Sequence, residues 1–420
     1  MIESTQSLLP ALSSKAPLKV LCVGFEENSM SELDRLLTTL GVNPVSHVLV
    51  KLRSINPGTY IGIGKLEEIK NEIEESLAEA VIVDVELSPN QLRNVEKAIG
   101  KPVLDRPGVI IEIFSQHART KEAKTQVEIA RLNYLLPRLA HFWTHFERQR
   151  GGMQLKGMGE KQIEVDRRLV KKRIEILRGR LASIEKERTV QRAGRKSVLK
   201  VAFVGYTNAG KSTLLNALTH SNVRAEDKLF ATLDASVRAL DPHSHPPIVA
   251  IDTVGFISRL PPSLIASFRS TLEELHQADL LVHVVDASCE NPKEQLKVTE
   301  EVLKDLGVEK KARITVLNKA DLLGNLKTRN IARIICPGSL LISAINKNDV
   351  DRLREVILEH FRKELEVWEV LLPYGESKLE AQVHAHGSVE RVQHIQKGTF
   401  YRVRIEPGWA RKLGLARYKL

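Results

Sequence analysis

The chain has 420 residues, of which 42% are hydrophobic and 27% are charged, a composition typical of globular proteins with roughly three domains. No apolar run approaches the ~20 residues of a membrane-spanning helix. The cysteines Cys22, Cys289 and Cys336 lie far apart without metal-ligand spacing. We interpret them as thiols of a protein in the reducing cytoplasm, with Cys22 and Cys289 buried in or beside apolar strands. The composition therefore excludes a membrane-spanning protein and a disulfide-rich secreted one.

Strand and helix patterns alternate in the first quarter of the chain. Residues 1–17 lack a signal-peptide pattern, and we expect them to form a flexible tail. Apolar strands are predicted at 18–24, 80–85 and 101–105, an amphipathic helix at 31–40, and a further helix after the capping residue Ser88 and Pro89. This alternation predicts a small α/β subdomain with a parallel sheet.

A short G-x-G-K sequence at residues 62–65 opens a helical pattern within this subdomain. Glycines before a helix can bind a phosphate, so one interpretation is a second anion site that takes ATP. The other interpretation is a tight turn without a ligand.

Two stripes of apolar residues with heptad spacing follow, on either side of a glycine-rich link. They predict an antiparallel helical hairpin whose arms of about 25 residues are ~37 Å long. Pro137 lies inside the first arm and should kink it. The stripes consist of Ile129, Leu132, Leu136, Leu139, Trp143 and Phe146, and of Ile163, Val170, Ile174, Leu177, Leu181 and Ile184.

Positive charge is concentrated in this hairpin. Residues 145–200 hold 17 Lys and Arg against 7 Asp and Glu, which accounts for most of the formal net charge of +11. Such concentration favours a polyanion such as RNA as the partner, whereas the alternative is a solvated helix face. The tip combines glycines with cations and is our candidate RNA contact, although it can also be a plain connection between helices. The residues predicted to contact RNA are Arg150, Gly151, Gly152, Lys156, Gly157 and Lys161.

The strongest motif in the chain is a phosphate-binding loop. Residues 205–213 match G-x-x-x-x-G-K-[ST] and lie between the apolar run 201–204 and a helical pattern. Glycines let backbone N–H groups turn towards a phosphate. Lys211 is predicted to reach the outer phosphates and Ser212 to bind Mg²⁺.

Three further motifs follow in the order that a guanine nucleotide enzyme needs. The strand at 248–252 ends in D-x-x-G, in which Asp252 would hold Mg²⁺ through water and the Gly255 N–H would sense the terminal phosphate. The strand at 314–317 leads into N-K-x-D, whose Asp321 can accept from two guanine donors that adenine lacks. The strand at 340–342 leads to Ser343 and Ala344, whose backbone can meet the guanine O6.

This set resembles the translation-factor-like GTPases. The residue after the D-x-x-G glycine is Phe256, which cannot orient a water molecule as the usual glutamine does. In some related GTPases an asparagine in the place of Asn208 helps to hold K⁺; here it can also simply bond within its loop. Resemblance and chain position together make Thr232 the candidate switch threonine that completes the Mg²⁺ shell.

The chain resembles more specifically the HflX family of GTPases, and the resemblance covers about residues 18–365. It implies a ribosome-associated GTPase that binds the large subunit through the hairpin, near the peptidyl transferase centre. The chain departs from the family pattern at Met153, Gln154 and Met158, and it lacks the usual glycine in residues 345–348. The segments that carry the resemblance are 87–94, 104–108, 113–114, 118–120, 126–128, 151–152, 157–160 and 166–168.

The nucleotide-site prediction covers the four motifs and the switch segment. Its catalytic members are Lys211, Thr232, Asp252 and Gly255, the Mg²⁺ ligands are Ser212 and Thr232, and Asn208 is the K⁺ candidate. The residues predicted to bind GTP are Gly205, Tyr206, Thr207, Asn208, Ala209, Gly210, Lys211, Ser212, Thr213, Phe230, Ala231, Thr232, Leu233, Asp234, Asp252, Thr253, Val254, Gly255, Asn318, Lys319, Ala320, Asp321, Ser343, Ala344 and Ile345.

We therefore expect an α/β protein that hydrolyses GTP on the large ribosomal subunit, in ribosome splitting, rescue or assembly. One alternative is a GTP-dependent switch that docks a protein partner through the hairpin; another is an RNA-remodelling NTPase. We expect a cytoplasmic, ribosome-associated monomer without a membrane span, with a peripheral membrane location as an alternative. The predicted parts are the tail 1–17, the α/β subdomain 18–115, the hairpin 116–194, the GTPase domain 195–366 and a small α+β domain 367–420.

Overall fold

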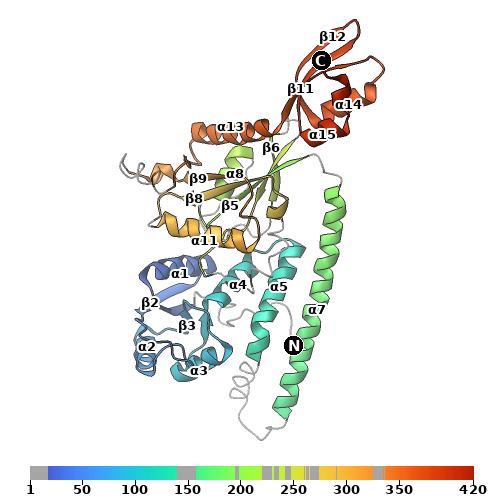
Figure 1. Cartoon of the computed structure of the whole chain (residues 1–420). Coiled ribbons are helices and arrows are strands. Elements are labelled where there is room, and N and C mark those ends of the chain that lie inside the picture. Colours follow the sequence, from blue (N-terminus) through green and yellow to red (C-terminus); the bar gives the residue numbers. More distant parts are fainter. Residues whose placement is uncertain are drawn as a thin grey trace. The chain divides into compact units, whose positions relative to one another are not determined.

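The computed structural model describes the chain as two compact units (Figure 1). Unit 1 comprises residues 1–188, 226–234 and 259–270, and unit 2 comprises residues 189–225, 235–258 and 271–420. The residues that the structure describes are 18–139, 158–193, 198–219, 229–230, 236–241, 247–259, 261, 264, 274–289, 291–324, 334 and 336–420.

Unit 1 begins with a four-stranded parallel sheet in the order β2-β1-β3-β4, as predicted from the alternating pattern. Leu21 and Val23 face one core with α2 and α3, while α1 and α4 contact each other. The strand β2 was not predicted, because Pro44 and polar residues interrupt its apolar pattern; proline is tolerated there because β2 is an edge strand. The elements are β1 (Lys19–Gly24), α1 (Glu27–Leu40), β2 (Asn43–Leu49), α2 (Ile63–Ser76), β3 (Ala80–Val83), α3 (Pro89–Ile99), β4 (Val103–Asp105) and α4 (Arg106–His117).

Helix starts in this subdomain follow the sequence signals. Ser88 and Gln91 form a capping box at the start of α3, and Pro89 occupies its first turn. The G-x-G-K segment is the start of α2, with Gly62 as the N-cap. Lys65 pairs with Glu68 one turn along the same helix. The structure therefore makes this segment a helix start, and a second anion site there stays a prediction.

Two buried arginines of unit 1 form ion pairs with acidic side chains. Arg106 is 1% exposed and binds Asp84 (0% exposed) and Glu32. Arg138 binds Asp105 at 3.2 Å and stacks on Tyr134 with 3.8 Å between the guanidinium carbon and the ring centroid. Removing one member of such a pair destabilises the fold, because the other member is then a buried charge without a partner.

The predicted helical hairpin is present in its described parts. Figure 1 shows α5 (Lys121–Leu135) alongside α7 (Met158–Ala193). Their shared core contains Ile129, Leu132, Val170, Ile174 and Leu177. The second arm has 36 residues and is therefore ~54 Å long, longer than expected. At Pro137 the α-helix gives way to a short 3-10 turn, Leu136–Arg138, as a proline inside a helix requires. The predicted tip at 150–157 lies outside the described residues.

Two short segments of unit 1 lie within the sequence range of the GTPase motifs. Residues 226–234 contain the predicted switch, and residues 259–270 follow the D-x-x-G motif. The ring of Phe230 packs edge-on against Phe114 with 4.7 Å between centroids. Leu229 donates its backbone N–H to the Thr39 hydroxyl, and Arg259 binds Glu26 at 2.6 Å. Phe230 is thus a buried packing residue of unit 1, and its contact with nucleotide stays a prediction.

Unit 2 is built on a six-stranded sheet in the order β10-β9-β8-β5-β7-β6. All strands are parallel except β6, which pairs antiparallel to β7. The strand β5 lies between β8 and β7, so the phosphate-binding loop follows a central strand. The elements are β5 (Leu199–Gly205), α8 (Lys211–Thr219), β6 (Ser236–Asp241), β7 (Ile248–Asp252), β8 (Leu280–Asp286), α11 (Pro292–Asp305), β9 (Arg313–Asn318), η3 (Ala320–Leu322), β10 (Leu340–Leu341) and α13 (Lys347–Glu364).

The last part of the chain forms a three-stranded antiparallel sheet in the order β11-β13-β12. Val370, Val403 and Ile405 form its core with α14 and α15. The predicted fold class, which comprises a parallel α/β part, a central P-loop sheet and a small α+β part, is therefore confirmed. The elements are β11 (Glu366–Leu372), α14 (Ser377–His386), β12 (Gly387–Ile395), β13 (Gly398–Ile405), α15 (Pro407–Lys412) and η4 (Leu415–Tyr418).

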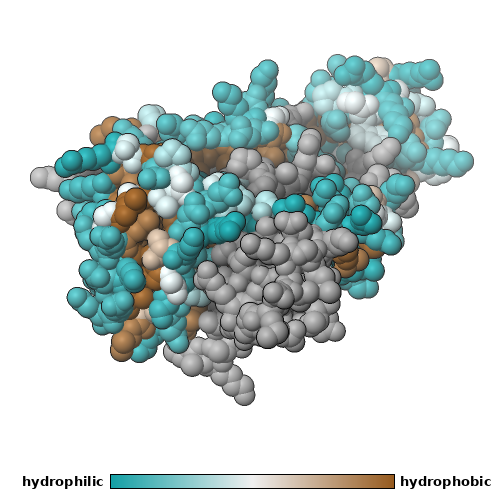
Figure 2. All heavy atoms as spheres, turned by 90° about the horizontal axis from the view of Figure 1, so that it is seen from below, coloured by the Kyte–Doolittle hydropathy of each residue, from teal (hydrophilic) through white to brown (hydrophobic). Residues whose placement is uncertain are grey.

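Surface polarity agrees with the composition. Figure 2 shows hydrophilic residues over much of one face, with hydrophobic areas between them. Among the described residues, no helix is both long enough and apolar enough to cross a membrane.

Candidate nucleotide site

The nucleotide motifs gather because their strands are parallel neighbours. The phosphate-binding loop follows β5, Asp252 ends β7, Asn318 ends β9, and Ser343 comes shortly after β10. Carboxyl ends of parallel strands lie at one edge of a sheet, which is where α/β proteins bind ligands. The structure therefore brings the motifs of unit 2 to a common edge.

Two loop glycines are required by close backbone approaches. Gly205 has φ +149°, and a Cβ there would collide with the carbonyl of Val284 on the neighbouring strand. Gly210 has φ +89°, and a Cβ there would collide with the side-chain amide of Asn318. Both dihedral angles are unfavourable for residues with a side chain. The loop conformation is thus fixed by the protein itself.

Lys211 is buried at the first turn of α8. Its Nζ donates to the carbonyl oxygens of Gly205, at 3.1 Å, and Tyr206, at 2.8 Å. Burial lowers the pKa of Lys211 to about 8, although the negative charge of Asp252 opposes this shift. A phosphate would supply the negative charge that this ammonium group lacks, so the lysine is suited to bind one.

Ser212 and Asp252 bring oxygen atoms together beside the loop. The Ser212 hydroxyl donates to Asp252 Oδ2 at 2.7 Å. Hydroxyl and carboxylate oxygens are the ligands that Mg²⁺ prefers, usually with several waters retained. Gly255 has no room for a side chain, because a Cβ would lie 2.9 Å from Lys211 Nζ and 2.8 Å from Thr207 Cα. The residues present fit Mg²⁺ held directly by Ser212 and through water by Asp252.

The segment after D-x-x-G runs beside the phosphate-binding loop. Phe256 donates its N–H to the Gly205 carbonyl at 3.1 Å, and the Thr207 N–H donates to the Phe256 carbonyl at 2.7 Å. The Phe256 side chain is 2% exposed. An apolar, buried ring cannot orient an attacking water, so the described residues leave this catalytic function unassigned.

Asn318 connects the loops on the base side. Its Nδ2 donates to the Ala209 carbonyl at 2.9 Å, and its Oδ1 accepts from the Ala344 N–H at 3.0 Å. Lys319 has a left-handed backbone, φ +62°, and its Nζ binds Asp286 at 2.7 Å. Asn318 therefore ties the phosphate-binding loop to the segment after β10.

A pocket opens beside the base-side motifs. Asp321 accepts from the Ser343 hydroxyl, and Asp349 accepts from the Ser343 N–H at 2.9 Å. Asn346 caps α13 by accepting from the Asn348 N–H, so the segment closes without the glycine that the family usually has. The lining residues include Ala320, Asp321, Ser343, Ile345, Asp349 and Arg352.

Sequence reasoning missed Asp286 and Asp349. Each is an ordinary acidic residue outside a motif, and only the fold places it against Lys319 or Ser343. Of the predicted site residues, Ala231, Thr232, Leu233 and Asp234 lie outside the described residues, as do the RNA candidates at 150–157; Lys161 lies in α7, but its side chain is not described.

Three family models match consecutive parts of the chain. They are the GTP-binding GTPase N-terminal region at residues 27–115, the GTP-binding GTPase middle region at 117–195, and the 50S ribosome-binding GTPase at 200–319.

Relatives match most of the chain. The GTPase HflX of Caldanaerobacter subterraneus is 43% identical over 375 residues, covering 89% of this chain and 86% of the relative. The GTPase HflX of Escherichia coli is 38% identical over 365 residues, covering 86% of each. Among solved structures, a GTP-binding protein of Sulfolobus solfataricus in complex with GDP is 27% identical, with a TM-score of 0.42, and the match covers 81% of this chain and 98% of that one. The chain belongs to the HflX family of GTPases, which hydrolyse GTP and generally use Mg²⁺.

Proposed function

We propose that this GTPase acts on the large ribosomal subunit and that GTP controls its binding there. The observation that carries the proposal is the complete set of nucleotide motifs at one sheet edge, together with the match of residues 200–319 to a 50S ribosome-binding GTPase. The role is ribosome splitting, rescue or assembly, in a cytoplasmic, ribosome-associated protein that is a monomer by itself.

Phosphate binding falls to the loop that follows β5. Backbone N–H groups between Gly205 and Thr213 and the ammonium group of Lys211 would neutralise the phosphates. Bound Mg²⁺ would supply further charge neutralisation at the outer phosphates. Ser212, Asp252 and the switch residue Thr232 would hold it, and the Gly255 N–H would respond to the terminal phosphate. Burial of Lys211 strengthens its interaction because little water screens it.

Guanine selection is assigned to Asp321. Its carboxylate would accept from N1–H and the exocyclic amine, while Lys319 would cover the base and the Ser343–Ala344 backbone would meet O6. Adenine lacks that donor pair, so it would leave the carboxylate without its partners. The hydroxyl of Ser343, which now donates to Asp321, helps to orient that carboxylate.

Hydrolysis needs a group that this chain does not supply at Phe256. We propose that the ribosome completes the site and that K⁺, held by Asn208, contributes positive charge at the phosphates. Asn208 has a left-handed backbone, φ +59°, and is partly exposed in the phosphate-binding loop. Single-turnover GTP hydrolysis in K⁺ and in Na⁺, with and without large subunits, tests both parts. Equal rates in the two salts would contradict the role of K⁺.

The hairpin is the proposed RNA-binding element. On α7, the buried stripe of Val170, Ile174 and Leu177 faces α5, and cations lie exposed around the rest of the helix. Phosphate contacts by such side chains make binding fall steeply with salt. The exposed cations on the described part of α7 are Arg167, Arg168, Lys171, Lys172, Arg178 and Arg180.

Sedimentation with purified large subunits tests this proposal. We expect binding with a non-hydrolysable GTP analogue to exceed binding with GDP, and a Lys171→Glu, Lys172→Glu variant to lose affinity and salt dependence. The matched control is Lys70→Glu, Lys97→Glu, which reverses two exposed charges elsewhere. Equal binding with both nucleotides would contradict the switch, and equal losses in the two variants would contradict the hairpin contact.

One observation favours the alternative of a docked protein partner. Apolar side chains on α7 are exposed, namely Val165 (46%), Leu169 (51%) and Ile176 (44%). A protein partner would cover them, and binding would then depend weakly on salt. A Leu169→Ser, Ile176→Ser variant that loses binding while the charge-reversal variant keeps it would favour this alternative.

A further inference from the structure

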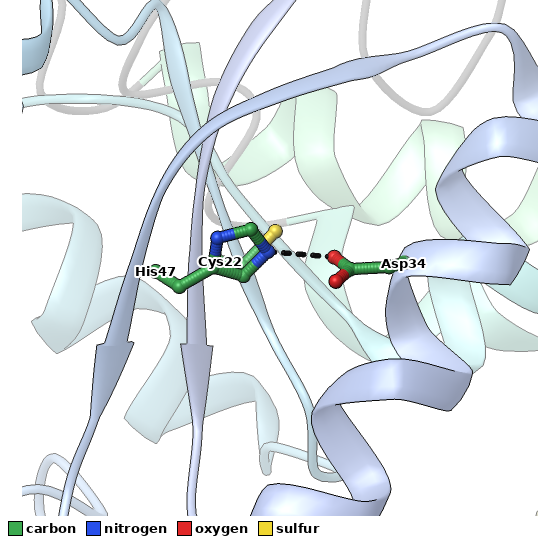
Figure 3. Close-up of side chains that lie close together, drawn as sticks. All are labelled: Cys22, Asp34 and His47. Carbon is green, nitrogen blue, oxygen red and sulfur yellow. Dashed lines mark hydrogen bonds and ion pairs between the residues drawn. The ribbon is translucent and has the colours of Figure 1, made fainter.

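Three potential metal ligands converge in the α/β subdomain of unit 1. Cys22 lies on β1, Asp34 on α1 and His47 on β2. Their ligand atoms all lie within 4.8 Å of one another. Figure 3 shows the thiol of Cys22, the imidazole of His47 and the carboxylate of Asp34 close together, with a dashed line for the 2.7 Å bond between His47 Nε2 and Asp34 Oδ1.

The sheet register brings the thiol and the imidazole together. Cys22 and His47 are direct partners on the parallel strands β1 and β2, so their side chains leave the same face of the sheet. An irregularity between Val20 and Leu21 shifts this pairing by one residue. Without it, Ser46 would face Cys22, and His47 would belong to the opposite face.

The helix α1 completes the cluster. Leu21 and Val23 pack into the core on the α2 and α3 side of the sheet, so Cys22 points to the other side, where α1 lies. Asp34 reaches both neighbours, because it bonds to His47 and its charge acts on the Cys22 thiol. Three rigid elements thus hold the three groups.

We propose that Cys22, Asp34 and His47 bind a thiophilic divalent cation such as Zn²⁺. Thiolate, imidazole and carboxylate are the three ligand types that Zn²⁺ uses in proteins. Mg²⁺ and Ca²⁺ are disfavoured, because they prefer oxygen ligands and avoid thiolates. Three protein ligands leave one tetrahedral position for water, so the site has the composition of an open, exchangeable centre.

The geometry requires only small adjustments. Zinc–ligand bonds of ~2.0–2.3 Å at tetrahedral angles place ligand atoms ~3.3–3.8 Å apart. Within the present cluster, the His47–Asp34 bond would open by less than about 1 Å from 2.7 Å, and the thiol would approach from within 4.8 Å. The side chains of His47 and Asp34 are partly exposed, so rotation about their χ angles can separate the two ligand atoms by this distance.

Access and charge also favour a cation. The side chains of His47 and Asp34 are 40% and 39% exposed, whereas Cys22 is buried beneath them. A cation would enter from the solvent side, and the thiol proton would pass to solvent as the S–metal bond forms, with no change of oxidation state. Asp84 adds a second negative charge near the thiol, although Arg106 pairs with it.

A nucleophilic role for Cys22 fits less well. Burial, with Asp34 and Asp84, raises the pKa of the thiol to about 12, so the free protein holds it protonated and unreactive. The alternative to a metal site is a hydrogen-bonded pair of His47 and Asp34 above an unreactive thiol, and the experiment below distinguishes the two.

Cobalt(II) titration of the full chain tests the site, with excess Mg²⁺ and GDP present to occupy the nucleotide site. A thiolate ligand gives Co²⁺ an intense near-ultraviolet charge-transfer absorption, which Zn²⁺ should then displace. We expect one equivalent of this absorption in the unaltered protein and in Cys336→Ser, the control for another thiol. We expect its loss in Cys22→Ser.

Two further variants keep the test independent of the buried position. His47→Gln and Asp34→Asn change partly exposed side chains. Each should weaken Zn²⁺ binding by at least ~10-fold, because even residues that only hydrogen-bond to a metal ligand contribute ~10-fold or more to metal affinity. Competition with a chromophoric chelator measures this, and GTP hydrolysis should be unchanged. Absence of the thiolate absorption, or Zn²⁺ affinity unaffected by all three variants, overturns the proposal without affecting the proposed GTPase function.

Discussion

Asn318 donates a hydrogen bond to the backbone carbonyl of Ala209 over 2.9 Å, joining the end of β9 to the phosphate-binding loop. The same side chain accepts from the Ala344 N–H. One buried amide, 1% exposed, therefore links the phosphate-binding and base-side segments of unit 2. The bond to Ala209 is buried and the bond to Ala344 is partly buried, so the Ala209 carbonyl depends most on this side chain.

We expect Asn318→Ala to weaken GDP binding strongly. The change leaves the buried Ala209 carbonyl without this partner, at about 1–3 kcal/mol, and removes the acceptor of the partly buried Ala344 N–H. This corresponds to at least ~10-fold lower affinity if the unliganded protein relaxes only partly. Titration with a fluorescent GDP analogue measures it. Asn291→Ala, which removes the cap of α11, is the control, and equal affinity in the two variants would contradict the linking role.

Asp321→Asn should change base preference. Asparagine offers one acceptor and an NH₂ donor, so it mismatches the guanine amine but suits a carbonyl at that position, as in xanthine. We expect GTP affinity to fall by ~100-fold and xanthosine triphosphate to bind better than GTP. Competition between the two nucleotides against a labelled analogue measures this. Unchanged GTP preference would show that Asp321 does not contact the base.

Asp349 should act as a positioning residue for the base-side loop. Its carboxylate accepts from the Ser343 N–H at 2.9 Å, and hydrogen bonds to a charged group contribute about 1.5–3 kcal/mol. We expect Asp349→Ala to weaken GDP binding ~10-fold and Asp349→Asn, which keeps an acceptor, to restore much of it. Asp351→Ala on the exposed face of α13 is the control. Failure of the asparagine variant to recover affinity would argue against this contact.

His283 should make unit 2 sensitive to acid. It is 1% exposed on β8, neither ring nitrogen has a hydrogen-bond partner among the described residues, and burial lowers its pKa to about 3. Between pH 3 and 6.5 the unfolded chain therefore binds more protons than the folded one, so stability rises with pH and is lost as pH falls through this window.

His283→Leu should remove the dependence of stability on pH that comes from this histidine. It should also raise the free energy of unfolding by about 1–3 kcal/mol at pH 7, because an apolar side chain replaces a buried ring whose nitrogens lack hydrogen bonds. Hydrogen exchange of β8 peptides at pH 5 and pH 7 measures both effects. His276→Leu changes an exposed histidine and is the control. Equal pH dependence in the two variants would contradict the assignment.

Arg106→Met should destabilise unit 1. The change leaves Asp84 buried without its guanidinium partner, and breaking a buried pair in this way costs about 3–5 kcal/mol. A double variant, Arg106→Met with Asp84→Leu, should recover part of the loss, since both charges are then removed. Hydrogen exchange of β3 measures it. No recovery in the double variant would indicate that packing, rather than charge, dominates at this position.

The nucleotide site was predictable because its motifs are local. Each lies at the end of an apolar strand, and parallel pairing then brings them to one edge. By contrast, the contacts of Asp349 and Asp286 depend on where α13 and β8 lie, which no short pattern in the sequence specifies.

The fold class was predictable from alternation, but individual elements were not all visible. The strand β2 was missed because an edge strand tolerates Pro44 and exposed polar residues. The same omission hid the cluster at Cys22, because its ligands meet only once the register of β2 is known. Cysteine spacing alone indicated no metal site, since only one of the ligands is a cysteine.

The glycine at position 205 has a consequence for comparing family members. Its lack of a side chain is imposed by the Val284 carbonyl on the adjacent strand, whether or not a nucleotide is bound. A descendant that had lost GTP binding would still retain this glycine as long as β5 and β8 remained paired. Loss of nucleotide function during evolution should therefore be sought first at Lys211 and Asp321, whose chemistry the nucleotide itself requires.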